Sequence, residues 1–257
     1  MRNIIGIDIG GSTTKIVGLR DGEVMGAARV RASDPLTSAY GAFGRFLNDT
    51  GLRLDQVDQV ICTGVGSSFL GQEIYGIPTE KVEEFLAIGL GGKFISGLDH
   101  CIVVSMGTGT AVTAVSGEEI AYVGGTGVGG GTKEGKMGRV DLTIGDITQN
   151  QLANMNNSTT AANFGKIPDD ATDADLAMGV INMVFQTIGI VSMMAAKAHG
   201  TDQIVLTGSL TRMEAAGQVI RSLEELYGVH YIIPKKSEYS TAIGAALYGQ
   251  QQEKRKR

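Results

Sequence analysis

Residues 4–17, with the sequence IIGIDIGGSTTKIV, hold the most suggestive set of chemical groups in the chain. An acid, Asp8, lies near the end of an apolar strand-like run and is followed by Gly10, Gly11, three hydroxyl residues and Lys15. A glycine turn lets backbone N–H groups approach an anion closely, and the hydroxyl and ammonium groups add donors. An acid that can hold hydrated Mg²⁺ beside such a turn is typical of nucleotide-phosphate chemistry. A glycine hairpin with a solvated or helix-capping aspartate explains the same letters, so this stretch alone leaves both interpretations open.

Glycines elsewhere in the chain gather in similar places. The chain has 38 glycines, and their clusters lie mostly after β-rich runs, at 10–11, 64–66, 107–109, 124–131 and 208. They are not spread in the way that a flexible linker would spread them. The distribution therefore predicts several backbone-lined loops that converge on one ligand.

The elements that must position these loops recur in the same order. Strands are predicted at 3–8, 13–19, 23–31, 58–63, 101–106, 110–115, 119–123, 203–207 and 229–233, and helices at 37–49, 80–96, 174–199, 210–227 and 240–250. The plan of IGIDIGGSTTKIV returns in VVSMGTGTAVTAV, and QVICTGVG is matched by QIVLTGSL. Such a duplication predicts an α/β fold of two pseudo-equivalent lobes with a ligand cleft between their glycine turns.

Composition narrows the class of protein. Apolar residues make up 42% of the chain and charged residues 19%, as in ordinary globular proteins, and the net charge of −5 argues against a nucleic-acid partner. We expect no membrane partner, because the longest apolar segment is interrupted by Asn182 and Gln186. Cys62 and Cys101 are expected to be buried, reduced thiols of a cytoplasmic protein. The basic tail at 251–257 is interpreted as a solubilising end rather than a site.

An ordered series of motifs carries a family resemblance over roughly residues 3–249. The series DIGGSTTKIV, SMGTGTAV, GGTGVGGGT, GDIT, TAANFGK, LTGSL and TAIGAALY resembles, in this order, the motifs of type II pantothenate kinases. These belong to the superfamily of acetate and sugar kinases, heat-shock chaperones and actin. The resemblance implies two ribonuclease-H-like lobes, each a mixed sheet flanked by helices, with ATP and Mg²⁺ held in the cleft between them.

The same resemblance implies an activity and an organisation. The activity is transfer of the γ-phosphoryl of ATP to the primary hydroxyl of pantothenate, the first step of coenzyme A synthesis. The first lobe would span 1–97 and the second 98–250, and the family implies a homodimer in which 174–199 is a plausible contact. Feedback by coenzyme A or its thioesters is left open.

Roles carry over from the family by position. Asp8 would help to hold Mg²⁺, and Lys15 would lie near the transferred phosphoryl. Asp146, in the GDIT motif, is a further candidate magnesium or substrate ligand, and Ser105, Thr108 and Tyr122 would face the substrate. The nucleotide would be held by Gly10, Gly11, Ser12, Thr13, Thr14, Gly107, Thr108, Gly109, Thr110, Gly125, Gly127, Gly129, Gly130, Gly131, Gly208 and Ser209.

The general base implied by the family falls on Glu84, in the segment KVEEFLAIG. A carboxylate on a helix that borders the cleft can accept the proton of the attacking hydroxyl. Glu83 and Glu84 together also read as a charged first helical turn, favoured by the helix dipole. That simpler interpretation suits Glu83 better than Glu84, which has the family position behind it.

Two departures concern the acceptor side of the site. The family usually has an arginine just before the glycine-rich segment, where this chain has Ala121 and Tyr122. The segment that follows Thr132, KEGKMGRVDLTI, is shorter than its family counterpart. Substrate binding is therefore either rearranged or assigned to another group.

Three alternatives share the predicted fold. A sugar kinase would use the same phosphate turns, but a zinc-binding Cys/His cluster found in one large group of them is missing from the sequence. An activator of 2-hydroxyacyl-CoA dehydratases shares the opening motif, but its cluster-binding cysteines are not matched by Cys62 and Cys101. A nucleotide-binding protein that no longer catalyses is the alternative from another functional class.

Overall fold

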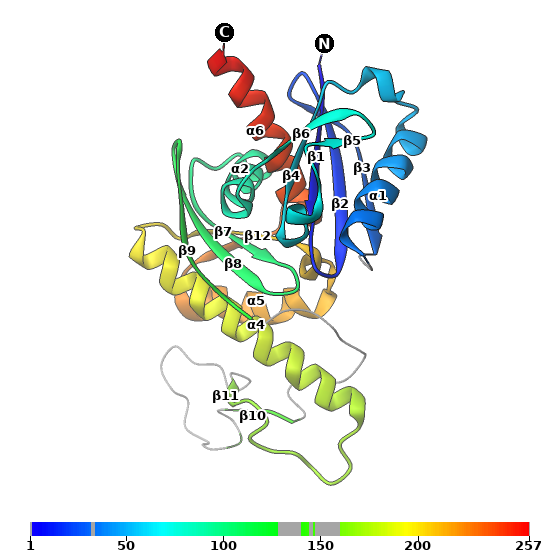
Figure 1. Ribbon diagram of the computed structural model, residues 1–257. Coiled ribbons are helices and arrows are strands. Elements are labelled where there is room, and N and C mark those ends of the chain that lie inside the picture. The colour runs from blue at the N-terminus through cyan, green and yellow to red at the C-terminus, as the bar shows by residue number, and fades with distance from the viewer. Residues whose placement is uncertain (1, 32–33, 128–139, 144–145, 147–159, 257) are drawn as a thin grey trace.

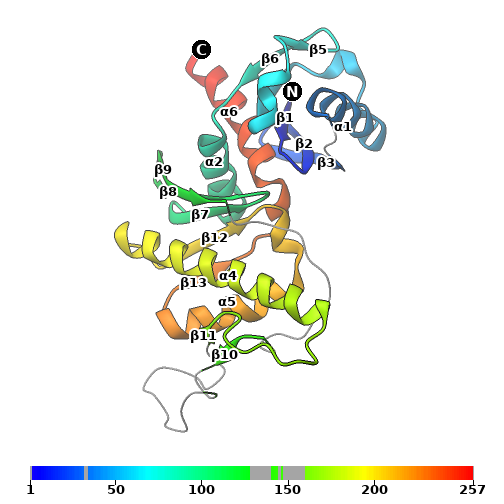
Figure 2. The same cartoon turned by 60° about the horizontal axis from the view of Figure 1, so that its bottom comes forward.

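Two mixed β-sheets with their helices build two lobes, shown from two directions for a computed structural model in Figures 1 and 2. The structure describes residues 2–31, 34–127, 140–143, 146 and 160–256. The strand order is β3-β2-β1-β4-β6-β5 in the first sheet and β13-β12-β7-β8-β9 in the second, and β10 pairs with β11 separately. The α/β fold of two lobes predicted from the sequence is confirmed.

The bounds of the elements follow the chain. The strands are β1 (Asn3–Ile9), β2 (Thr13–Arg20), β3 (Glu23–Arg31), β4 (Gln59–Thr63), β5 (Glu73–Ile74), β6 (Ile77–Lys81), β7 (His100–Met106), β8 (Thr110–Ser116), β9 (Glu119–Thr126), β10 (Leu142–Thr143), β11 (Thr160–Ala162), β12 (Gln203–Thr207) and β13 (His230–Ile232). The helices are α1 (Pro35–Thr50), α2 (Glu84–Ser96), α4 (Asp173–Ala198), α5 (Glu214–Tyr227) and α6 (Ser240–Lys256). Short 3₁₀ turns are η1 (Leu54–Gln56), η2 (Val65–Phe69), η3 (Ser209–Arg212) and η4 (Ser237–Tyr239).

The duplication is visible in the topology. Read from its antiparallel edge, the first sheet runs β3-β2-β1-β4-β6, and the second runs β9-β8-β7-β12-β13 in the matching order. In each lobe the first strand pairs antiparallel with the second and parallel with the strand that arrives after a long connection. Each sheet therefore brings a tight glycine turn and the carboxyl end of a parallel strand to the same edge.

Both faces of each sheet are apolar because both are covered by helices. In the second sheet, Ile102 and Val104 pack with α4 and α5, whereas Cys101 and Val103 pack with Ile88 of α2 on the other face. This alternation follows from the period of two in a strand. Figure 2 shows the result as layers, with the second sheet between α2 and the pair α4 and α5.

Helices α2 and α6 cross between the two sheets at a contact made of small residues (Figure 1). A Cβ atom at Gly244 of α6 would lie 1.8 Å from the carbonyl oxygen of Ala87, and one at Gly91 of α2 would lie 1.9 Å from that of Ser240. Only glycine allows the two backbones to approach so closely. The crossing joins the lobes by direct contact between helix backbones.

The last helix returns to the first lobe. Ala245 and Ala246 of α6 pack with Ile4 and Ile61 of the first sheet, although the sequence assigned residues 98–250 to the second lobe. A Cβ at Gly6 of β1 would lie 2.0 Å from a carbonyl oxygen of α6. Helix α6 also continues to Lys256, so part of the predicted basic tail is helical.

Helix α4 is long and apolar enough to cross a membrane by length and composition, with a mean hydropathy of 1.7, although half of that stretch is buried in the structure. Its inward side packs on the second sheet through Phe185 and Ile188. Asn182, which interrupts the apolar pattern, is buried and donates to Asp141 at 2.6 Å. The helix therefore serves as a core helix of the second lobe, as the sequence predicted.

One hairpin was missed. The sequence predicted that a helix begins at residue 80, but Thr79 and Glu80 lie in β6, which pairs with β4, and α2 begins at Glu84. Strands β5 and β6 are joined through Tyr75 and Gly76, both with positive φ. Two such residues form the tight turn that matches the strand twist, but a tyrosine in this conformation is unusual, which hides the turn from sequence reasoning.

Candidate active site

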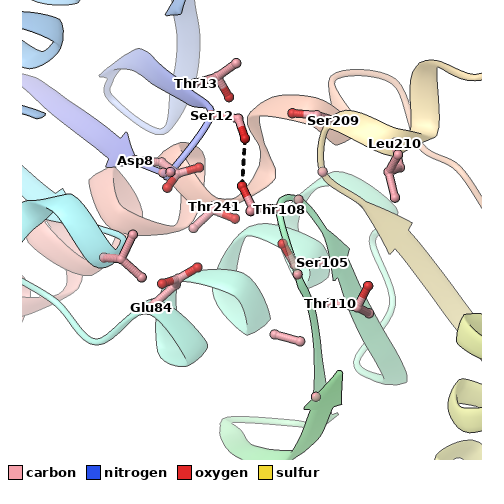
Figure 3. A pocket seen from close by; sticks show the side chains of 18 of the residues that line it. Asp8, Ser12, Thr13, Glu84, Ser105, Thr108, Thr110, Ser209, Leu210 and Thr241 are labelled. Carbon is pink, nitrogen blue, oxygen red and sulfur yellow. Dashed lines mark hydrogen bonds between the residues drawn. The ribbon is translucent and has the colours of Figure 1, made fainter. Parts of the chain in front are cut away.

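The two glycine turns face one another across the cleft between the lobes. In the β1–β2 turn the Gly10 N–H donates to the Thr13 carbonyl at 3.1 Å, and in the β7–β8 turn the Gly107 N–H donates to the Gly109 carbonyl at 2.9 Å. The tips meet where the Oγ of Ser12 and the Oγ1 of Thr108 lie 2.8 Å apart, the dashed contact in Figure 3. Residues 96 positions apart therefore present hydroxyl and backbone donors to one place.

A pocket of about 750 Å³ lies between these turns, within the size range of small-molecule sites. It brings together most of the residues singled out from the sequence: Asp8, Gly10, Gly11, Ser12, Thr13, Lys15, Glu84, Ser105, Gly107, Thr108, Gly109, Thr110, Tyr122, Gly125, Gly127, Gly208 and Ser209. Gly129, Gly130 and Gly131 lie outside the described residues, as does most of the segment after Thr132. The convergence of loops inferred from the glycine clusters is thus seen in the structure.

Two of the candidate residues are not brought to the pocket. Thr14 is fully buried and is not among the lining residues, because it lies between Thr13 and Lys15 on a strand and so points to the opposite face. Asp146 also lies away from the lining. Its carboxylate pairs with Lys166 at 2.6 Å and accepts hydrogen bonds from the N–H and hydroxyl of Thr143, which together lower the pKa of Asp146 to about 2.

The lining also includes residues that sequence reasoning did not select. They are Val65, Phe85, Ala111, Thr126, Leu210, Met213 and Thr241. Most of them are apolar, and although several lie inside the quoted motifs, an apolar residue type carries no chemical signal. Phe85 is the one residue of this set that its neighbour could have indicated, because it follows the candidate base Glu84 directly at the exposed start of a helix.

Charge in the pocket centres on Asp8, Lys15 and Glu84. Asp8 and Lys15 are partners across the β1–β2 ladder, and the Lys15 Nζ lies 3.2 Å from the Asp8 Oδ2, with both side chains nearly buried. Burial raises the pKa of Glu84, the charge of Asp8 raises it further, and Lys15 opposes the shift. A carboxylate with a raised pKa is a better proton acceptor than an ordinary surface glutamate.

Glu84 owes its position to the helix start. Glu83 is the exposed N-cap residue of α2, and Glu84 is the first helical residue, half-buried and facing the pocket (Figure 3). Burial and the charge of Asp8 raise the pKa of Glu84 at this helix start. The structure thus distinguishes the two glutamates in the way the sequence analysis did.

The pseudo-symmetry explains two further glycines. Gly64 and Gly208 follow β4 and β12 with φ values of 85° and 93°. A Cβ at Gly208 would lie 2.4 Å from the Met106 carbonyl oxygen, and one at Gly64 would lie 2.7 Å from that of Ile9. At both glycines the backbone must turn sharply against the end of the neighbouring strand, and only glycine combines that conformation with the close approach.

The same symmetry relates Asp8 to Ser105. Asp8 pairs with Thr63 across β1 and β4, and Ser105 pairs with Thr207 across β7 and β12, at corresponding places in the two sheets. Both Asp8 and Ser105 line the pocket. One lobe therefore offers an acid at this position and the other a neutral hydroxyl, so the two halves of the site are chemically distinct.

Solved structures of other proteins share this two-lobed architecture. The chain resembles the activator of the 2-hydroxyisocaproyl-CoA dehydratase from Clostridium difficile with bound ADPNP, with a TM-score of 0.65, 17% identity and coverage of 99% of this chain and 97% of that one. It also resembles a ROK family glucokinase from Streptomyces griseus in complex with glucose and AMPPNP, with a TM-score of 0.58, 14% identity and coverage of 97% and 99%. At these identities the likeness shows the actin-like fold alone, and both proteins carry ATP analogues.

In sequence, the chain is similar to type II pantothenate kinases. It is 28% identical to the type II pantothenate kinase of Bacillus anthracis over 280 residues, which cover 96% of this chain and 98% of the relative. The model of the Fumble family matches residues 132–245. The family resemblance stated from the motifs is confirmed, and it supports a kinase.

The cysteines bear on the structural likeness to a dehydratase activator, a protein expected to bind its cluster through cysteines. Cys62 and Cys101 are the two cysteines of the chain, and they lie buried in β4 and β7, in different sheets. Burial raises the pKa of Cys62 to about 12 and that of Cys101 to about 11, so neither is a thiolate at neutral pH. The expectation that both are buried thiols is confirmed.

Proposed function

We propose that this chain is a pantothenate kinase, which transfers the γ-phosphoryl of ATP to the primary hydroxyl of pantothenate. The observation that carries the proposal is the pocket in which Glu84, the Asp8–Lys15 pair and both glycine turns meet. The relationship to type II pantothenate kinases over 96% of the chain supports the choice of acceptor.

In the proposed reaction, the acceptor hydroxyl attacks the γ-phosphorus as the bond to the β-phosphate oxygen breaks. Glu84 accepts the proton of that hydroxyl, for which its raised pKa suits it. The N–H groups and hydroxyls of the two turns bind the phosphate oxygens, and Lys15 offsets part of the charge on the transferred group. ADP leaves with the electron pair of the broken P–O bond.

The described residues of the pocket could bind a hydrated Mg²⁺ ion, but they do not supply a complete set of protein ligands for it. No group of three or more His, Cys, Asp or Glu side chains that could hold a metal occurs in the described part of the chain. Asp8 lines the pocket and supplies one carboxylate, and Mg²⁺ bound with nucleotide commonly needs only one or two. When bound, the ion would neutralise charge on the phosphates.

The test compares the wild-type chain with Glu84→Ala and with Glu83→Ala as a matched control. Glu83 is the neighbouring exposed acid, and its side chain makes no capping hydrogen bond. We expect pantothenate-dependent ADP release from the wild type, a fall in kcat of at least about a hundredfold for Glu84→Ala, and a change below about threefold for Glu83→Ala. A Glu84→Ala enzyme with normal kcat would remove it as the base. ATP binding without any pantothenate-dependent turnover would favour the non-catalytic alternative, and turnover with a sugar instead would favour the sugar kinase.

We also propose that the chain forms a homodimer through α4. Val180, Met183 and Met194 are exposed on this helix at 42%, 38% and 61%, at spacings that place them on one face. A buried core helix needs only one apolar side, so a second apolar stripe is explained by a partner. Light scattering should show a dimer for the wild type and a monomer for Met183→Glu with Met194→Glu, and a wild-type monomer would refute the assignment.

A further inference from the structure

The start of helix α6 brings a further hydroxyl group to the pocket. Thr241 is the second residue of this 17-residue helix, and it opens the motif TAIGAALY, the last of the ordered series. Its side chain lines the pocket with those of Asp8 and Thr108 (Figure 3), although only 6% of the residue is exposed. A nearly buried hydroxyl that borders a ligand pocket can direct its hydrogen bond at a bound ligand.

The Thr241 hydroxyl is not used by the helix itself. Threonines inside a helix can return their hydroxyl to a carbonyl one turn earlier, as Thr50 does to the Phe46 carbonyl at 2.7 Å. In the described part of the chain, no hydrogen bond joins the Thr241 hydroxyl to another residue, and none is drawn to it in Figure 3. The hydroxyl therefore keeps its donor for a group that enters the pocket.

Backbone contact with β1 directs the start of α6 to the face that carries the Asp8–Lys15 pair. A Cβ at Gly6 would lie 2.0 Å from the carbonyl oxygen of Ala242, the residue after Thr241. Asp8 follows Gly6 by two positions and so shares its face of the strand, and Lys15 stands opposite Asp8 in the ladder. Thr241 thus enters the pocket from the side of the first sheet on which both charged groups lie.

Two further backbone contacts fix the same helix start. A Cβ at Gly91 of α2 would lie 1.9 Å from the Ser240 carbonyl oxygen, so α2 presses on the residue before Thr241. The Gly208 N–H donates to the Ser237 carbonyl at 3.0 Å, which ties the turn before α6 to the glycine turn after β12. Because three elements hold the helix start, its hydroxyl is placed before a ligand arrives and needs little rearrangement to bind a reacting group.

The chemistry of this position suits a phosphate oxygen. The first turn of a helix carries the positive end of the helix dipole, which favours an anion. A threonine hydroxyl can donate to such an oxygen while its methyl group packs against the protein. In the proposed reaction Lys15 lies near the transferred phosphoryl, so the phosphate that reaches the same side of the pocket is the terminal one.

We propose that the Thr241 hydroxyl donates a hydrogen bond to an oxygen of the terminal phosphoryl group of ATP, both in the bound nucleotide and during its transfer. The inference rests on the proposed function, because it adds a catalytic residue to that same reaction. It gives α6, the helix that joins the lobes, a direct contact with the reacting group.

The experiment removes the hydroxyl in two ways and keeps it in a third. Thr241→Val keeps the branched shape, Thr241→Ala avoids any misfit of the second methyl group, and Thr241→Ser keeps the hydroxyl. Thr37→Val is the matched control, because Thr37 also lies in the first turn of a helix but does not line the pocket. Isothermal titration with Mg²⁺ present measures the Kd for ADP and for ADPNP, which differ by the terminal phosphoryl group, and steady-state kinetics with pantothenate measure kcat.

We expect Thr241→Val and Thr241→Ala to raise the Kd for ADPNP about tenfold while the Kd for ADP changes less than about twofold, because a hydrogen bond to a charged group is lost at the terminal phosphoryl alone. Their kcat should fall at least about tenfold. Thr241→Ser should keep both Kd values and kcat within about threefold of the wild type, and Thr37→Val should leave all three unchanged. A purely structural role would instead weaken the binding of ADP and ADPNP alike.

Failure of the inference and failure of the proposed function give different results. The contact is refuted if the ratio of the two Kd values stays within about threefold of the wild type in Thr241→Val and Thr241→Ala. A kcat within about threefold of the wild type in both variants refutes the part of the hydroxyl in transfer. If the wild type binds ADPNP but does not phosphorylate pantothenate, the proposed function is refuted, whereas the Kd ratio still tests the contact because it needs no turnover.

Discussion

Replacing Gly244 with alanine should weaken the junction between the lobes. The new Cβ would lie 1.8 Å from the Ala87 carbonyl oxygen and 2.8 Å from the Gly91 nitrogen, both of them backbone atoms of α2. Ordinary contacts of this kind lie at about 3.5 Å, so the two helices must separate by more than about an ångström. They cannot do so locally, because Gly91 makes the reciprocal contact with Ser240 one turn away.

The expected loss follows from two opposing terms. Overpacking of a close backbone contact costs about 3 kcal/mol, and alanine regains about 1 kcal/mol over glycine as a helix former. The net loss of about 2 kcal/mol lowers the melting temperature by about 4 °C in a chain of this length. Circular dichroism at 222 nm during heating measures this, with urea titration as a second estimate.

Gly44→Ala is the matched control. Gly44 is an exposed residue of α1 with nothing within 4 Å of its added Cβ, so the same substitution should stabilise by about 0.5–1 kcal/mol. Opposite signs for the two variants are the expected result. A Gly244→Ala chain that melts at or above the wild-type temperature would show that the helices are not in the close contact described.

Three further outcomes are expected. Glu84→Gln should raise the melting temperature at neutral pH, because a pKa that is higher in the folded than in the unfolded state means that ionised Glu84 opposes folding. The gain in melting temperature should vanish below the unfolded pKa of about 4.3. An unchanged melting temperature at pH 8 would contradict the burial of the Glu84 charge. For the same reason, kcat/KM of the wild type should fall toward acid pH with an apparent pKa above the ordinary glutamate range, and Glu83→Ala should leave that profile in place. Gly208→Ala should raise the Kd for an ATP analogue about tenfold, since its φ of 93° and the Met106 carbonyl both resist a side chain; isothermal titration measures this Kd, and unchanged affinity counts against a nucleotide role for this turn.

The strand plan and the two glycine turns could be predicted from sequence because their signals are local. Gly10 and Gly11 lie between two apolar runs, and the pattern recurs at 107–109, so both hairpins follow from turn chemistry. The β5–β6 hairpin could not be predicted in this way, because Tyr75 occupies a turn position that usually holds asparagine or aspartate.

The aromatic part of the pocket lining depends on tertiary placement. Phe85 is one of several exposed aromatic residues in the sequence, and only the packing of α2 on β9 brings its ring to Tyr122. Asp146 is the opposite case. A motif match made it a candidate ligand, but its carboxylate does not line the pocket and pairs with Lys166 instead. A lone carboxylate has no spacing pattern from which its partner could be inferred.

Helix α6 has a consequence for how the molecule is made. Ile4, Leu19 and Ile61 leave the ribosome long before Ala245 and Ala246, which pack on their apolar face. The opposite face of the same sheet can pack on α1 much earlier. A nascent chain that has reached residue 239 must therefore carry one side of its first sheet only partly covered, by Val82 and Ala87, through most of synthesis. The first lobe closes only after the second has been translated, so the two halves of the duplication mature together.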